Sequence, residues 1–111
     1  MALKMSQPEF NELGWRLFFK DRRTTLYYIR FKHNRKTYYK IGITTQEISK
    51  RFASENIAYD VLFARSYKSG MTAYNKEQAI IKKNAKHRYF GPPLLRSGNS
   101  EVFTTNIMKG A

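Results

Sequence analysis

The chain has 111 residues, which suits one domain with a single modest core and leaves no room for separate catalytic and recognition domains. Its 21 Lys and Arg against 8 Asp and Glu give a net charge of +13, so a polyanion such as nucleic acid is the expected partner. The chain has no cysteine, which excludes disulfides, thiolate metal sites and a cysteine nucleophile.

Hydropathy predicts neither a signal peptide nor a membrane span. The first residues, Met1 to Pro8, contain no long apolar run, and nowhere do about 18 apolar residues follow one another. We therefore expect no membrane partner and an intracellular protein, cytoplasmic or nucleoid-associated rather than secreted.

The first elements predicted along the chain are a short helix and a β-hairpin. The helix is expected at Pro8–Trp15, and β-branched and aromatic residues predict strands at Thr24–Phe31 and Thr37–Thr44. The polar segment 33–36 is typical of a hairpin turn. Because side chains alternate along a strand, Tyr38, Lys40 and Gly42 share one face, and Tyr39, Ile41 and Ile43 share the other.

The second half predicts a helix, a strand, a longer helix and a last short strand. Thr44 or Thr45 is expected to cap the first helix, which runs through Glu47 to about Ser54 with this acid in its first turn. The remaining elements are a strand at Ala58–Ser66, a helix at Met71–Lys86 ended by the Gly91-Pro92-Pro93 break, and a strand at Glu101–Phe103. This order predicts an α/β (α+β) fold, with a small mixed or antiparallel sheet opened by the hairpin and flanked by two main helices.

Glu77 is the main anomaly in this pattern. It falls within an apolar stripe of the longer helix, formed at helical spacing by Ala73, Tyr74, Ile80, Ile81 and Ala85. A carboxylate is costly to bury without a cation or hydrogen-bond donors. Its position therefore indicates a metal ion, an arginine or a hydrogen-bonding network next to it, and the alternative is an internal salt bridge to a structural Lys or Arg.

Two weaker signals come from Arg51 and from the tyrosines of the hairpin. Arg51 lies near the apolar face of the shorter helix, where an ordinary pair with Glu47 would also explain it. The hairpin combines Lys40 with four tyrosines, which are Tyr27, Tyr28, Tyr38 and Tyr39. Most of these aromatic residues are expected to pack in the core. A phenol beside an ammonium group can nevertheless have a lowered pKa and accept a proton from water, as phosphodiester hydrolysis requires.

Competing chemistries lack the necessary residues. His33 and His87 are the only histidines, which is too few for a histidine zinc site or an HNH-type nuclease. Asp21 and Asp60 are the only aspartates, so the chain has few ligands for a two-metal carboxylate cluster. No glycine-rich phosphate loop is present.

The order of these residues resembles the GIY-YIG nuclease family from Thr24 to Phe103. Thr25-Leu26-Tyr27, continuing as Tyr28-Ile29, resembles the first motif, and Lys40-Ile41-Gly42-Ile43-Thr44 resembles a Lys-Ile-Gly version of the second. Arg51 and Glu77 match the arginine and glutamate of the two following helices. The chain departs from the family at Thr25, where glycine is usual, and at Glu55, where histidine is often found.

The resemblance implies a role for each matching residue. Tyr27 would activate or orient the attacking water, with Lys40 as a proton acceptor or phosphate contact. Arg51 would hold the scissile phosphate, and Glu77 would bind one Mg²⁺ or Mn²⁺ beside the leaving oxygen. Gly42 would let the backbone approach the site closely. Further nucleic-acid contacts are expected from Arg30, Tyr39, Lys50 and Asn99, where Asn99 matches the family's late asparagine and Glu101 is a rival polar candidate.

The sequence therefore predicts a metal-dependent endonuclease that acts on nucleic acid, with DNA favoured over RNA. Residues 1–23 would form an N-terminal extension, 24–105 the nuclease domain and 106–111 a tail. The main alternative is a basic nucleic-acid-binding module without catalysis. A structural or partner-binding protein is a third possibility, which the high charge disfavours.

Overall fold

The computed structural model describes residues 22–95 and 101–108, and its centre is a four-stranded sheet. The strands are β1 (Thr24–His33), β2 (Lys36–Thr44), β3 (Tyr59–Tyr67) and β4 (Val102–Phe103), in the order β3-β1-β2-β4. All three pairings are antiparallel, so of the two predicted sheet types the antiparallel one is correct. The expected helix at Pro8–Trp15 lies outside the described residues.

The predicted hairpin is confirmed, and its register places Tyr27 opposite Gly42. His33 pairs with Lys36, which leaves a loop of two residues, Asn34 and Arg35, with φ of 50° and 68°. Positive φ at both loop residues matches the twist of the flanking strands, as in the favoured two-residue hairpin turns. The strands extend two residues further at the turn than predicted in β1 and one in β2.

Both helices are shorter than predicted. The first, α2 (Ile48–Arg51), covers a single turn, begins after Glu47 rather than Thr44 or Thr45, and has no acid in its first turn. Thr44 instead accepts a hydrogen bond from the Gln46 N–H in the preceding bend. The second, α3 (Gly70–Lys83), ends at Asn84, whose side chain donates to the Ile80 carbonyl. The remainder of the predicted helix forms the 3₁₀ turn η2 (Ala85–His87), where Ala85 is exposed.

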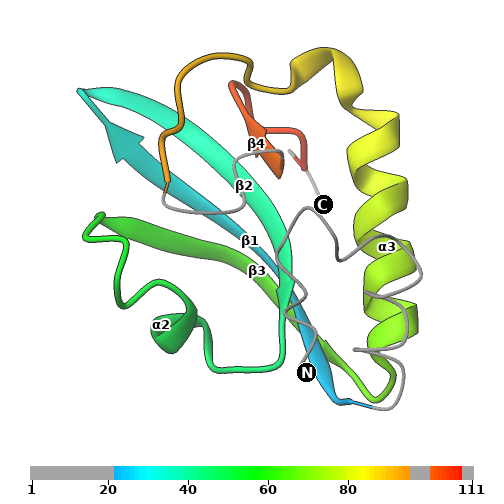
Figure 1. The fold of residues 1–111 in the computed structure, drawn as a ribbon. Coiled ribbons are helices and arrows are strands. Elements are labelled where there is room, and N and C mark those ends of the chain that lie inside the picture. Colours follow the sequence, from blue (N-terminus) through cyan, green and yellow to red (C-terminus); the bar gives the residue numbers. More distant parts are fainter. Residues whose placement is uncertain (1–21, 96–100, 109–111) are drawn as a thin grey trace, which may run out of the picture.

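Each face of the sheet carries its own hydrophobic cluster. Tyr27, Ile29 and Phe31 of β1 pack with Phe52 beyond α2, whereas Leu26 and Tyr28 pack on the other face with Ile80 and Ile81 of α3. Figure 1 shows the corresponding arrangement, with α2 and α3 on opposite sides of the strands. Strand alternation thus sends neighbouring residues of β1 into different surroundings.

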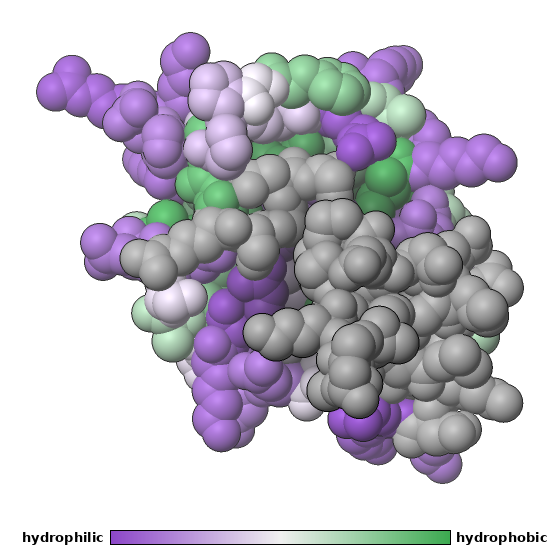
Figure 2. Space-filling model, in the orientation of Figure 1, coloured by the Kyte–Doolittle hydropathy of each residue, from purple (hydrophilic) through white to green (hydrophobic). Residues whose placement is uncertain are grey.

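The end of the described chain packs against the α3 face. The Asn106 side chain and the Ile107 N–H bond to the Tyr28 hydroxyl, so residues 106–108, predicted as part of a tail, contact the body. In Figure 2, hydrophilic side chains lie along much of the outline of the part of the chain that the structure describes. No helix among the described residues is long and apolar enough to cross a membrane.

Candidate active site

Tyr27 lies directly on the backbone of Gly42 in the neighbouring strand. The two residues are cross-strand partners, and a Cβ built on Gly42 would stand 2.4 Å from the Tyr27 hydroxyl oxygen. Such a contact is far inside van der Waals distance, so only glycine fits beneath this ring. Gly42 therefore permits the close backbone approach that the sequence predicted, and the neighbour it accommodates is the candidate tyrosine.

Four charged groups from four elements act on the Tyr27 phenol. Lys40 of β2 and Arg51 of α2 lower its pKa, while Glu101, just before β4, and Glu77 of α3 raise it. Burial is the largest influence, and the net pKa lies above the usual value of 10.0. The expected lowering by a neighbouring ammonium is present but smaller than the desolvation, because the side chain is almost completely enclosed.

Lys40 is fully buried and forms an ion pair with Glu101. Its ammonium donates to the Glu101 carboxylate at 2.8 Å, and the exposed fractions of the two side chains are 1% and 28%. The pairing of Lys40 with Val102 in the sheet brings Glu101 to this position. Glu101, a rival polar candidate from the sequence, is thus part of the charged cluster and compensates the buried lysine.

Glu77 is buried as its place in the apolar stripe predicts. Its exposed fraction is 4%, and Ala73, one turn earlier on α3, is completely buried. Burial, reinforced by repulsion from Glu101, raises the Glu77 pKa to about 8, and the Gln78 side chain and Lys40 offset this rise only in part. Gln78 donates to Glu77 at 3.1 Å, but among the described residues no Lys or Arg lies within ion-pair distance. The internal salt bridge considered above is therefore not found there.

Arg51 approaches the site from α2 through an aromatic contact. Its guanidinium lies 4.9 Å from the centre of the Phe52 ring, and Phe52 meets Tyr27 edge-on at 5.5 Å. The Arg51 partner is Glu55, with 3.7 Å between nitrogen and oxygen, rather than the Glu47 pair considered from the sequence. Glu55 is itself buried. Arg51 retains an exposed fraction of 21%, so solvent, or an anion, can reach its side chain.

The residues at Glu77 suit a divalent cation that also takes ligands from solvent and substrate. Among residues 22–95 and 101–108, no three His, Cys, Asp or Glu side chains gather as a ready-made metal cage. Mg²⁺ usually needs only one or two carboxylates, together with water and phosphate oxygens. A cation beside Glu77 would also stabilise the charged form of this carboxylate, and so offset the effects of burial and of Glu101 that raise its pKa.

The four predicted nucleic-acid contacts lie in different places. Arg30 is exposed and pairs with Asp60 at 2.9 Å, and Lys50 is exposed on α2 beside Arg51. Tyr39 stacks on Tyr28 with ring centres 5.9 Å apart, on the sheet face that carries α3. Asn99 lies outside the described residues. The structure thus gathers Tyr27, Lys40, Arg51 and Glu77 but not this second group.

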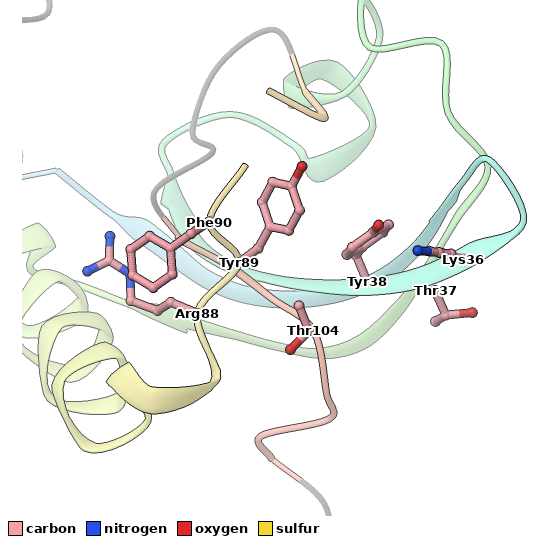
Figure 3. A pocket seen from close by; sticks show the side chains of 7 residues that line it. All are labelled: Lys36, Thr37, Tyr38, Arg88, Tyr89, Phe90 and Thr104. Carbon is pink, nitrogen blue, oxygen red and sulfur yellow. The ribbon is translucent and has the colours of Figure 1, made fainter. Parts of the chain in front are cut away.

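A groove next to the site was not predicted. Arg88, Tyr89 and Phe90 line it together with Tyr38 of β2 (Figure 3). The signal in the sequence is the run His87-Arg88-Tyr89-Phe90, in which two basic residues are followed by two aromatic ones just before the Gly-Pro-Pro break. Such a combination is typical of strand-binding surfaces on nucleic-acid-binding proteins.

Comparison of the chain with protein-family models, with curated proteins and with solved structures finds no match. Its function is therefore argued from the residues and their geometry.

Proposed function

We propose that the chain is a metal-dependent endonuclease that hydrolyses phosphodiester bonds of nucleic acid, preferentially DNA. The observation that carries this proposal is Glu77, a buried carboxylate without a cationic partner among the described residues, placed where its charge acts on Tyr27. A protein that only bound phosphate would gain nothing from such a carboxylate. The resemblance to the GIY-YIG nucleases supports the proposal, because Lys40, Arg51 and Glu77, which it singles out, each act on the Tyr27 phenol.

The charge distribution supports a polyanionic substrate. The net charge of +13 attracts phosphate backbones and makes their association salt-dependent. Within the cluster, Arg51 is the accessible cation, whereas Lys40 is buried and paired with Glu101. We therefore assign the contact with the scissile phosphate to Arg51, whose planar fork of donors suits a phosphate group.

Tyr27 and Lys40 would act on the attacking water. The raised pKa of Tyr27 keeps its hydroxyl protonated at neutral pH, so we assign it to orienting the water rather than to a resting phenolate. Lys40 would hold positive charge near the developing negative charge and keep the tyrosine pKa from rising further. Gly42 fixes the height of the hydroxyl over the strand, because the ring rests on its backbone.

Glu77 is the residue that would hold the divalent cation. A bound Mg²⁺ or Mn²⁺ supplies Lewis-acid stabilisation of charge on the leaving oxygen. The residues of this chain would provide its carboxylate and an enclosed environment, in which electrostatic interactions are stronger than in water. Binding would release the proton that the raised pKa of Glu77 favours near neutral pH.

Plasmid nicking tests this function. We expect the wild-type chain to nick supercoiled DNA with Mg²⁺ and not with EDTA, and Glu77→Gln to cut at least about 100-fold more slowly because the cation is lost. DNA binding measured in EDTA should change little in this variant. The matched control is Glu47→Gln, because Glu47 is exposed at the start of α2.

Two outcomes would count against catalysis. Nicking by Glu77→Gln at the wild-type rate would remove the central observation. Tight binding without cutting in Mg²⁺ or Mn²⁺ would favour the alternative, a non-catalytic nucleic-acid-binding module.

A further inference from the structure

An open groove with aromatic and basic walls lies along the outer part of β2. In Figure 3, Arg88 and Phe90 lie at one end of the groove and Lys36 at the other, with Tyr89 and Tyr38 between them. Phe90 is 79% exposed, the most exposed large apolar side chain that the structure describes. A ring left in water at this position contributes little to the core, so packing does not account for it.

Backbone pairing places this groove beside the candidate active site. The Tyr89 N–H donates to the Val102 carbonyl at 2.8 Å, and Val102 is the sheet partner of Lys40. Tyr38 precedes Lys40 by two residues on β2 and packs on the same sheet face as Tyr27. Two residues span about 7 Å of strand, so a nucleic-acid strand that crossed the candidate active site would reach the groove with an adjacent nucleotide.

Two of the three rings of the groove, those of Tyr38 and Tyr89, are held in fixed orientations. Tyr38 and Tyr89 meet edge-on, with ring centres 5.4 Å apart and planes at 77°. The Tyr89 hydroxyl donates to the Pro92 carbonyl at 2.6 Å, and Gly91 leaves room for it, because a Cβ there would stand 2.7 Å from the hydroxyl oxygen. A ring fixed in advance loses little entropy when a flat ligand stacks on it.

Arg88 adds a cation to the same wall. Its guanidinium lies 5.8 Å from the centre of the Phe90 ring, and its Nε is buried with no hydrogen-bond partner among the described residues. Because the Nε is enclosed, an incoming phosphate or base oxygen would meet the terminal guanidinium nitrogens of this half-buried side chain. Lys36 contributes a second positive charge at the edge of the groove.

We propose that this groove receives an unpaired base of the nucleic-acid strand whose backbone crosses the Tyr27–Glu77 site. The substrate is then a nucleic acid with an unpaired or unstacked nucleotide next to the cut, which negatively supercoiled plasmid offers where it locally unpairs and an undisturbed duplex does not. The inference rests on the proposed function, since it takes the neighbouring cluster as the cutting site. Paired bases hide their faces within the stack, whereas a free base can stack on Phe90 or Tyr38 while Arg88 at one end of the groove, or Lys36 at the other, contacts a phosphate of the strand.

Binding of labelled oligonucleotides tests the groove independently of cutting. We would measure fluorescence anisotropy in EDTA with single-stranded DNA, single-stranded RNA of the same sequence, and the blunt DNA duplex. Phe90→Ala should weaken single-strand binding about 5- to 100-fold, the loss expected for one base–aromatic stack. Phe90→Leu should behave like Phe90→Ala, Phe90→Trp should bind like the wild type, and blunt duplex binding should change less than twofold in all three variants.

Leu62→Ala is the matched control, because Leu62 is an exposed apolar residue of β3, at the opposite edge of the sheet. It should leave all three affinities unchanged. Unchanged single-strand binding in Phe90→Ala, equal losses for single strands and duplex, or full affinity in Phe90→Leu would each overturn the proposal. The two single-stranded probes distinguish DNA from RNA as the source of the base. If the wild-type chain shows the stacking pattern but never nicks DNA, the groove stands and the nuclease proposal fails.

Discussion

Tyr27 and Tyr28 are neighbours in one strand, and both are 1% exposed, yet their hydroxyl groups have opposite surroundings. The Tyr28 hydroxyl donates to Asn106 at 2.8 Å and accepts from the Ile107 N–H at 3.0 Å. The Tyr27 hydroxyl makes no hydrogen bond with a described residue and lies among four charged groups. The first arrangement fastens the end of the chain, whereas the second leaves a polar group available to a ligand.

Burial raises the pKa of both tyrosines, so the pKa direction alone does not distinguish them. The difference lies in what surrounds each hydroxyl. Backbone donors act on Tyr28, whereas side-chain charges act on Tyr27. A structural tyrosine has its hydrogen bonds satisfied within the fold, and a candidate catalytic one keeps capacity for substrate and water.

The largest expected effect comes from removing each hydroxyl in turn. Tyr27→Phe should lower the nicking rate by about 10²- to 10⁴-fold with little change in stability, because it removes the group that orients the water. Tyr28→Phe should cost about 1–3 kcal/mol of unfolding free energy, since it leaves the Ile107 N–H without its acceptor and removes one of the two donors to the Asn106 side chain, while cutting by the folded protein persists. Nicking assays and urea unfolding would measure the two quantities. The reverse pattern would show that we have exchanged the roles of the two residues.

A smaller effect concerns the pH dependence of stability without metal. Because folding raises the Glu77 pKa from 4.5 to about 8, the native state holds a proton that the unfolded state releases between these values. The contribution of Glu77 to stability should therefore be greatest below about pH 4.5 and should be lost as pH rises toward and through 8. The expected loss is on the order of a few kcal/mol, in proportion to the difference between the two pKa values.

Thermal unfolding in EDTA between pH 5 and 9 measures this slope. Glu77→Gln should flatten it, and Glu101→Gln should end the loss at a lower pH, because Glu101 helps raise the Glu77 pKa. Added Mg²⁺ should stabilise the wild-type chain more at pH 8.5 than at pH 6. Parallel slopes for the wild type and Glu77→Gln would contradict the assignment of the buried carboxylate.

The smallest effect is expected at Arg30, an exposed residue two positions after Tyr28 on β1. Its ion pair with Asp60 is exposed, with exposed side-chain fractions of 45% and 66%, so Arg30→Gln should change stability by less than about 1 kcal/mol. If Arg30 contacts phosphate, the slope of log affinity against log salt should fall by about 1. Asp60→Asn breaks the same ion pair without removing the cation, and serves as the control. Equal salt slopes for Arg30→Gln and the wild type would remove Arg30 from the binding surface.

Local sequence patterns predicted much of the fold. The hairpin followed from two β-rich stretches around a polar turn, and the burial of Glu77 followed from helical spacing. Helix ends were less accurate, because Asn84 bonds back to the Ile80 carbonyl and ends α3 before the apolar pattern does. The start of α2 was misplaced because Thr44 forms a bend instead of a cap.

Contacts between distant segments could not be predicted from the same patterns. Lys40 and Glu101 are 61 residues apart, and only the pairing of β2 with β4 brings them together. Likewise, Tyr38 and Tyr89 meet because the segment after α3 returns along Val102. The net direction of the Tyr27 pKa also depends on complete enclosure, which a count of neighbouring cations does not reveal.

Because Tyr27 rests on Gly42, the substitutions that are possible at position 42 depend on the residue at position 27. A methyl group at position 42 would collide with the hydroxyl oxygen at 2.4 Å and with the ring carbon that bears it at 2.6 Å, so removing the oxygen alone would not make room. Alanine fits at position 42 only after a smaller side chain has replaced the aromatic ring of Tyr27. Among descendants of this sequence, the order of substitution is thereby constrained, since loss of the tyrosine has to precede loss of the glycine.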